Sequence, residues 1–288
     1  MFESLPKEPD LWHYIRVVTA QLSEVLAVLE RLAPLQFAEP WDNVGLLVEP
    51  TPVAEAAALE SALLTIDLSD EVVAEAEQLG AKLIVAYHPP IFQGLKRLRS
   101  SQPSERSVLR CVAAGVSVFS PHTALDAAPN GVNQWLTEAF GPGARGPCLP
   151  SPIDERYGQG RFVRLAAAIS LSDAVSALKR QLGLAQLRVS AAAAHAADAP
   201  LIRNVAVCAG AGGSLFEKLS GFELYVTGEM RHHDVRARAQ GGNSVVLSEH
   251  THTERGFLPT FAQLLHVETA QRVRFYVSQC DREPLSLR

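Results

Sequence analysis

Apolar and polar positions along the N-terminal half alternate between short apolar runs and segments with helical spacing. Residues 22–33 have the spacing of an amphipathic helix, with Ser23 as its N-cap and Pro34 as its end. Strand, helix, strand, helix and strand are then expected at 62–68, 70–80, 82–87, 104–115 and 116–120. Alternating strands and helices predict an α/β fold, with a parallel sheet and helices packed over it.

The C-terminal half repeats this plan after a stretch at 141–160 that is rich in glycine and proline and is expected to be a linker. Strands are expected at 161–168, 187–190, 204–208, 224–227, 244–247 and 272–278, and helices at 172–183, 234–239 and 253–266. The low-complexity run 191–200 is expected to be a surface loop. We therefore expect two similar α/β lobes, 1–140 and 161–288, whose strand ends face a shared site.

Two segments, Ser120–Asp126 and Ser248–Glu254, share the pattern Ser-x-His-Thr-x-x-acid. Each follows an expected strand, and their histidines lie 128 residues apart, as do their acids. Open α/β sheets bind ligands at the carboxyl ends of strands. Imidazole and carboxylate, presented twice, form a ligand set for a divalent transition metal. The repeat predicts two halves that bring their strand ends together around metal.

Other polar side chains also follow expected strands. His88 comes after the strand 82–87 and precedes two prolines, which stiffen the backbone. It is either a loop histidine or a metal ligand, and its place in the same layer as His122 favours a ligand. Asp126 alone could equally be a turn or capping aspartate. Glu229 and His233, near the end of 224–227, are candidates for a general acid or base, with polar helix caps as the alternative.

Composition narrows the class of protein. The net charge of −5 and the pI of about 6.0 argue against direct nucleic-acid binding. Four cysteines without a Cys-x-x-Cys pair fit a reducing compartment. No membrane span or signal peptide is expected, so the cytoplasm or nucleus is favoured, with the mitochondrion left open. The turn from Gly210 to Ser214 is either a tight strand-to-helix turn or an anion cradle.

Five segments of the sequence resemble the NIF-three-like family, also called GTP cyclohydrolase I type 2 homologues, and are most similar to its animal branch. They are Phe37–Glu49, Tyr87–Phe92, Ser120–Asn133, Leu224–Asp234 and Glu249–Phe257. The resemblance implies a two-lobed α/β fold assembled as a ring-shaped homohexamer. It also implies one or two iron or zinc ions per chain, facing the central cavity.

Carried over by motif, the resemblance implies that the metal ligands are His88, Asp126, His250 and Glu254, with His122 as a further ligand or as a partner of one. Bacterial members typically carry two adjacent histidines where this chain has Tyr87 followed by a single histidine. The missing imidazole weakens one of two metal positions, or the tyrosine supplies a phenolic oxygen in its place.

Two functions follow as hypotheses. The first is a metal-dependent hydrolase of a nucleotide or related heterocycle, similar to GTP cyclohydrolase I type 2. In it, Glu229 or His233 would act as the general acid or base. The second is a non-catalytic regulatory or scaffold protein that binds transcriptional regulators, to which eukaryotic relatives are linked. Metal would then support assembly of the ring.

Overall fold

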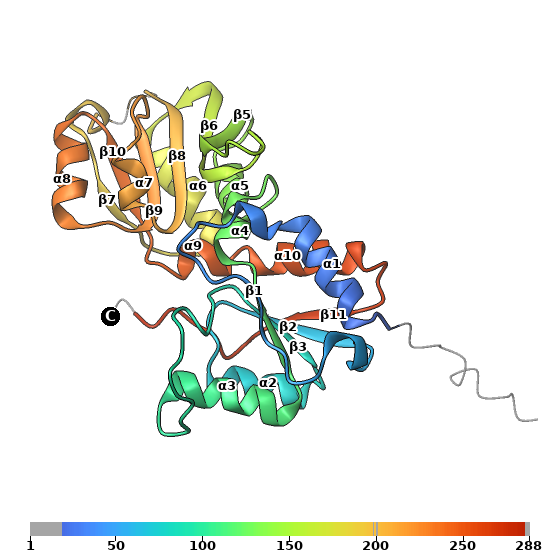
Figure 1. Cartoon of the computed structure of the whole chain (residues 1–288). Coiled ribbons are helices and arrows are strands. Elements are labelled where there is room, and N and C mark those ends of the chain that lie inside the picture. The colour runs from blue at the N-terminus through green and yellow to red at the C-terminus, as the bar shows by residue number, and fades with distance from the viewer. Residues whose placement is uncertain (1–18, 198, 200, 286–288) are drawn as a thin grey trace, which may run out of the picture.

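Two β-sheets form the centres of two lobes, as Figure 1 shows. The computed structural model describes residues 19–285 except 198 and 200. The expectation that the first twenty residues carry no signal peptide therefore falls almost entirely outside the described part. The first sheet has the strand order β1-β4-β3-β2-β11. Its strands are β1 (Gly45–Val48), β2 (Ser61–Thr65), β3 (Leu83–Ala86), β4 (Ser117–Ser120) and β11 (Arg274–Val277).

The second sheet has the order β5-β6-β8-β9-β10-β7. Its strands are β5 (Gly143–Pro150), β6 (Gly158–Ile169), β7 (Arg188–Ser190), β8 (Ile202–Ala211), β9 (Leu224–Glu229) and β10 (Ser244–Leu247). In each sheet three strands run parallel in chain order, β2-β3-β4 and β8-β9-β10, and a short strand pairs antiparallel with the last of them. The two halves therefore share a plan, and the expectation of two similar α/β lobes is confirmed.

Helices form a layer between the sheets and cover their outer faces (Figure 1). Helices α2 and α3 pack on the outer face of the first sheet, and α7 packs on the outer face of the second, with α8 against β10 and β7. Helices α1, α4, α5, α6 and α10 contribute to a core that both sheets share. The helices are α1 (Leu22–Leu32), α2 (Asp70–Gln78), α3 (Pro103–Ala114), α4 (His122–Ala127), α5 (Val132–Glu138), α6 (Leu171–Leu182), α7 (Gly213–Phe216), α8 (His232–Gln240), α9 (His252–Arg255) and α10 (Leu258–Glu268), with the 3-10 turns η2 (Leu35–Phe37), η3 (Val53–Glu55) and η4 (Ala193–His195).

The strand residues alternate between these layers. On β2, Ala62 and Leu64 belong to the shared core, whereas Leu63 packs beneath α2 and α3. On β8, Val205 and Val207 face the shared core and the residue between them faces away. This follows from the two-residue period of a strand. Because the central strands are buried on both faces, their apolar runs are continuous in sequence.

Two local expectations were wrong. The stretch 141–160 contains β5 and the start of β6 instead of a linker. Its prolines are tolerated because β5 is an edge strand, which needs hydrogen bonds on one side only. The strand expected at 272–278, as the last strand of the C-terminal half, is β11, which instead pairs with β2 in the first sheet. Sheet membership alone does not set domain boundaries, so the expected lobes at 1–140 and 161–288 stay a prediction.

The helix ends differ by a residue or two from expectation. Helix α1 begins one residue before Ser23, with Gln21 as the N-cap. Helix α6 begins after Ser170, whose hydroxyl accepts a hydrogen bond from the backbone N–H of Asp173 at 3.1 Å. The expected helix 253–266 is divided into α9 and α10, and Pro259 lies in the first turn of α10. Among the described residues, no helix is long and apolar enough to cross a membrane.

Candidate metal centre

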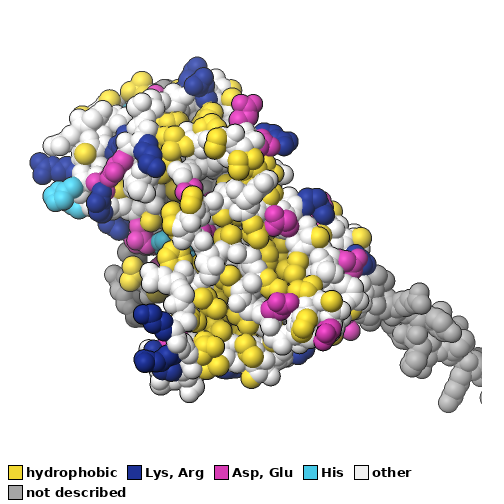
Figure 2. All heavy atoms as spheres, viewed as in Figure 1, with side chains coloured by type: hydrophobic (Ala, Val, Ile, Leu, Met, Phe, Trp, Pro, Cys, Tyr) yellow, Lys and Arg dark blue, Asp and Glu magenta, His cyan; other side chains and the backbone are white. Residues whose placement is uncertain are grey.

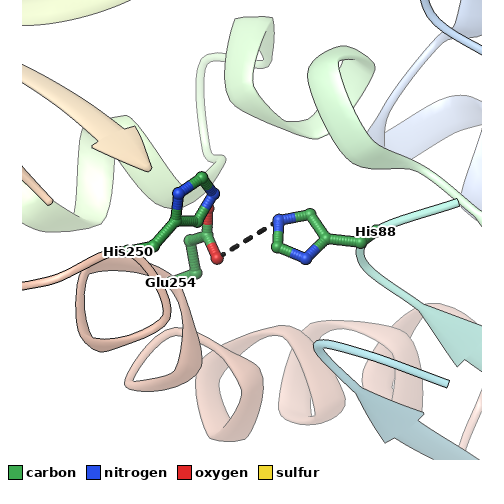
Figure 3. Close-up of side chains that lie close together, drawn as sticks. All are labelled: His88, His250 and Glu254. Carbon is green, nitrogen blue, oxygen red and sulfur yellow. Dashed lines mark ion pairs between the residues drawn. The ribbon is translucent and has the colours of Figure 1, made fainter. Parts of the chain in front are cut away.

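His88, His250 and Glu254 converge between the two lobes, as Figure 3 shows. Their ligand atoms all lie within 4.8 Å of one another. His88 follows β3 of the first sheet, while His250 follows β10 of the second and Glu254 lies in the short helix α9 behind it. The carboxyl ends of parallel strands from both sheets therefore supply the group. Two imidazole nitrogens and a carboxylate oxygen suit zinc or iron.

A carboxylate fixes the orientation of each imidazole in this group. Asp67, just after β2, lies 3.0 Å from Nδ1 of His88. Glu229, the last residue of β9, lies 2.8 Å from Nδ1 of His250. Each acid therefore sits at the end of the strand beside the one that precedes the histidine. With Nδ1 engaged, Nε2 is the nitrogen left for a metal, and such carboxylate–histidine pairs are typical of metal sites.

The same carboxylates control protonation. Burial lowers the pKa of His88, but the hydrogen bond to Asp67 and the nearby Glu254 outweigh it and raise the pKa to about 10. The pKa of His250 is raised to about 9, first by Glu254 and against burial, with a smaller contribution from Glu229. Burial would raise the pKa of Glu254, but hydrogen bonding and charge from the two histidines hold it below its usual value. Without metal, the group therefore consists of two protonated imidazoles around one charged carboxylate.

Glu254 supplies the test of whether a metal fits. Its side chain is only 3% exposed, and its Oε2 is buried without a hydrogen-bond partner. Oε2 lies 3.5 Å from Nε2 of His88, and Oε1 lies 3.3 Å from Nε2 of His250. Burying a carboxylate oxygen without a hydrogen-bond partner costs free energy of folding. A cation between these atoms would satisfy it, so the residues present fit a divalent ion.

A second cluster adjoins the group. His122 begins α4 with a φ of +24°, and Asp42 lies 2.8 Å from its Nδ1. The backbone N–H and the hydroxyl of Thr123 also donate to Asp42. These bonds hold the strained backbone of His122 in place. The His122 ring lies 5.4 Å from that of His88, centroid to centroid, at a steep angle.

Asp126 lies in this second cluster, outside the three-residue group. It is partly buried, and the Tyr87 hydroxyl donates a hydrogen bond to it. Burial raises the pKa of Asp126 to about 6, although His122 and the tyrosine counteract part of the effect. The pKa of Tyr87 is raised, first by burial and then by the negative charge of Asp126. The tyrosine is thus a hydrogen-bond donor to a carboxylate that the resemblance assigns to metal.

The two residues considered for acid–base roles lie in different places. Glu229 contacts His250, as described above. His233 lies exposed on α8, where its ring packs against that of His232. Within the described part of the chain, no hydrogen bond or ion pair joins His233 to the candidate metal ligands. The structure therefore brings the glutamate to the site and leaves this histidine away from it.

The glycine-rich turn after β8 is tight. The N–H of Gly210 donates to the hydroxyl of Thr253, and the N–H of Gly212 donates to that of Thr227, both at 2.8 Å. The N–H groups of Gly210 and Gly212 are therefore not free to hold an anion, which favours the interpretation as a tight turn. Asp42 and Asp67 were missed by the sequence reasoning. Asp67 was hidden inside the expected strand 62–68, which in the structure ends at Thr65. The signal for Asp42 was its place in the Phe37–Glu49 segment.

The sequence profile of Duf34/NIF3 (NGG1p interacting factor 3) matches residues 20–284. The chain belongs to this family. It is 37% identical to NIF3-like protein 1 of Drosophila melanogaster, over 92% of this chain and 88% of the relative. It is 36% identical to NGG1-interacting factor 3 of Saccharomyces cerevisiae, over 94% and 98%. A Bacillus cereus protein related to NIF3 shares the fold, with a TM-score of 0.80, 20% identity and coverage of 92% and 98%.

Proposed function

We propose that this NIF3-family chain binds a divalent metal ion, iron or zinc, through Nε2 of His88, Nε2 of His250 and the carboxylate of Glu254. The observation that carries the proposal is the buried Oε2 of Glu254, which has no hydrogen-bond partner and lies 3.5 Å from Nε2 of His88. Both imidazoles are held by carboxylates at Nδ1. Three protein ligands leave a coordination position open, as in catalytic sites.

We further propose one ion per chain. Asp126 would be needed for a second ion, but it accepts the hydrogen bond of Tyr87 and lies outside the group of three. Under this proposal, Asp126 and His122 line the site as neighbours of the ion and do not bind it. Elemental analysis of protein purified without added metal tests this: occupancy near one supports it, and occupancy near two contradicts it.

The reaction we propose is hydrolysis of a nucleotide or related heterocycle. When bound, a divalent cation supplies Lewis-acid chemistry. The chain supplies the rest: a cavity of about 360 Å³ lined by His122, Asp126, His250 and Glu254 holds the substrate. Glu229 holds His250 in orientation, and Asp126, hydrogen-bonded to Tyr87, is placed to hold or accept a proton at a carboxylate oxygen.

The test is turnover by metal-loaded protein against a panel of nucleoside mono-, di- and triphosphates and free heterocycles. The expected result is product that depends on metal and disappears in His250→Ala. His233→Ala is the matched control, since this histidine lies away from the site and should leave turnover and metal content unchanged. A panel without turnover, with metal bound at the expected occupancy, would count against hydrolysis.

A non-catalytic regulatory or scaffold role is the second candidate. The name of the yeast relative, NGG1-interacting factor 3, describes an interaction with a protein partner. On the face shown in Figure 2, hydrophobic side chains gather across both lobes, a surface that favours association. We propose self-assembly, in the hexameric ring that the resemblance implies. The scaffold role is favoured if His250→Ala breaks the oligomer into smaller species, as measured by light scattering, while no substrate is turned over by the parent chain.

A further inference from the structure

The cavity over the candidate metal centre extends well beyond the metal ligands. Besides His122, Asp126, His250 and Glu254, the residues that line it include an aromatic pair and a lysine, Trp41, Phe92 and Lys218. Its volume of about 360 Å³ lies at the lower end of the range for small-molecule sites. A ligand of that size can touch the metal end and these outer groups at once.

Trp41 and Phe92 form an aromatic rim. Their ring centroids lie 5.9 Å apart with planes tilted by 53°, and the Trp41 ring lies 6.1 Å from that of His122. Trp41 is 59% exposed and Phe92 is 48% exposed. Two large aromatic side chains that remain this exposed beside a cavity offer flat apolar faces to a ligand.

The segment that carries Trp41 is held on both sides. The N–H of Glu39 donates to the Thr123 hydroxyl at 2.9 Å. The backbone N–H of Thr123, at the start of α4, in turn donates to the carboxylate of Asp42. The side chain of Asn43 donates to the backbone carbonyl of Ile91, which precedes Phe92. These bonds fix the two aromatic segments relative to each other. The rim is therefore pre-organised, which reduces the entropy cost of binding.

Lys218 brings positive charge to the same cavity. Within the part of the chain that the structure describes, Lys218 forms no ion pair, and its neighbour Glu217 pairs with Arg231 at 2.7 Å. The carboxylates that line the cavity have other partners. Asp126 accepts from Tyr87, Glu254 faces the two imidazoles, and Glu39 accepts from Gln159. The lysine ammonium is thus left to pair with an anionic group of a ligand.

We propose that Trp41 and Phe92 bind the planar heteroaromatic ring of the substrate and that Lys218 binds its anionic group. The ligand class is a flat heterocycle that carries a phosphate or other anion, of which a nucleoside monophosphate is the simplest probe. The proposal rests on the proposed function for what happens at the metal end. The binding contacts themselves come from the rim and the lysine.

Calorimetric titration of the metal-loaded chain tests this directly. The probes are guanosine, adenosine and cytidine 5′-monophosphates, the nucleoside guanosine, which lacks phosphate, and ribose 5-phosphate, which lacks the ring. At least one monophosphate should bind, and ribose 5-phosphate should bind at least about tenfold more weakly, a difference of about 1.4 kcal/mol. Trp41→Ala and Phe92→Ala should each weaken nucleotide binding about tenfold or more, and Trp41→Phe should restore part of it.

Lys218→Ala should weaken monophosphate binding but leave guanosine binding unchanged, and Lys179→Ala on α6 is its matched control. Metal content and far-UV circular dichroism should stay as in the parent chain. The inference is overturned if no monophosphate binds, or if both aromatic variants bind with parental affinity. It is also overturned if Trp41→Ala changes only the oligomeric state, since the rim would then contact another copy.

The two proposals fail differently. Tight nucleotide binding that Trp41→Ala abolishes, without any turnover of the parent chain, contradicts only the proposed hydrolysis. Metal-dependent turnover that keeps its KM in the Trp41→Ala, Phe92→Ala and Lys218→Ala variants contradicts only the assignment of the rim.

Discussion

The backbone of Gly210 lies directly against the imidazole of His250. A Cβ placed on Gly210 would lie 2.8 Å from Nε2 of His250 and 2.9 Å from Oε1 of Glu254. The glycine also has a φ of +63°, which other residues adopt only with strain. Only a residue without a side chain allows the C-terminal end of β8 to approach the candidate ligands this closely.

Gly210→Ala should therefore abolish metal binding as well as destabilise the chain. The methyl group would displace the two ligand side chains, whose atoms must hold their positions to bind an ion. Gly183→Ala is a matched control. Gly183 has a similar φ of +67°, but a Cβ placed on it would have no neighbouring atom within 4 Å. Both variants should unfold at lower temperature, by an amount that reflects about 1–2 kcal/mol of backbone strain. Only Gly210→Ala should lose metal by elemental analysis; equal metal content in both would contradict the assignment.

The carboxylate at Nδ1 of His88 gives a second prediction. Asp67→Asn removes the charge while keeping the size of the side chain, so His88 loses the partner that fixes its ring and raises its basicity. Metal affinity should fall about 10–100-fold. Competition with a chromogenic chelator measures this. Asp234→Asn is the control, since Asp234 pairs with Arg231 on α8, away from the site. Equal affinities in the two variants would show that the pairing does not support a metal.

The sequence predicted the strand-end chemistry but not the contacts that complete it. The repeated Ser-x-His-Thr-x-x-acid pattern correctly placed His250 and Glu254 after a parallel strand, because apolar strands followed by polar residues are local signals. Their convergence with His88 from the other lobe matches the expectation of a shared site.

The partners of these histidines could not be read from local pattern. Asp42 lies 80 positions before His122 in the chain, and only the packing of two loops brings them together. The role of Gly210 was likewise hidden, because a glycine after a strand is equally typical of an ordinary turn. The strand β11 was assigned to the wrong sheet for the same reason: the pattern identifies a strand but not its neighbour.

Metal binding should release protons. In the metal-free chain the pKa of His88 is about 10 and that of His250 about 9, so both carry a proton at pH 7. A metal needs both nitrogens deprotonated, so binding should release about two protons per ion, and the logarithm of the apparent affinity should rise with a slope near two from about pH 7 to 8.5. Calorimetry in buffers of different ionisation enthalpy measures the release. Fewer than one proton per ion would contradict the assignment of both histidines.

The same shifts set the pH dependence of the metal-free chain. A folded-state pKa raised above the ordinary 6.5 means that the folded state holds these protons more tightly than the unfolded state. The stability that His88 and His250 contribute is fully present below pH 6.5 and is lost as pH rises through about 9 to 10. Thermal unfolding with a chelator present should show this decline, and His250→Ala should reduce its amplitude. A midpoint of thermal unfolding that rises between pH 6.5 and about 10 would contradict this prediction.

Asp126 and Asp42 should respond in opposite ways to the loss of their charge. The pKa of Asp126 is raised from 3.8 to about 6, mainly by burial, so the folded state favours its neutral form and its charge destabilises the fold above pH 6. Asp126→Asn should therefore stabilise the metal-free chain at pH 7, by at most about 3 kcal/mol, and the gain should vanish below about pH 4. Burial would raise the pKa of Asp42 too, but hydrogen bonds from His122 and Thr123 hold it below 3.8.

Asp42→Asn should accordingly destabilise the chain at pH 7, since its charge is stabilising there, and the loss should shrink as the pH falls through the lowered pKa of Asp42. Urea unfolding of the two variants with a chelator, at pH 3 and pH 7, compares them in the same cluster. If both asparagines destabilise the chain equally at pH 7, burial does not control the Asp126 carboxyl. The hydrogen bond from Tyr87 would then stabilise its charged form, and the carboxylate would be as available to a cation as that of Glu254.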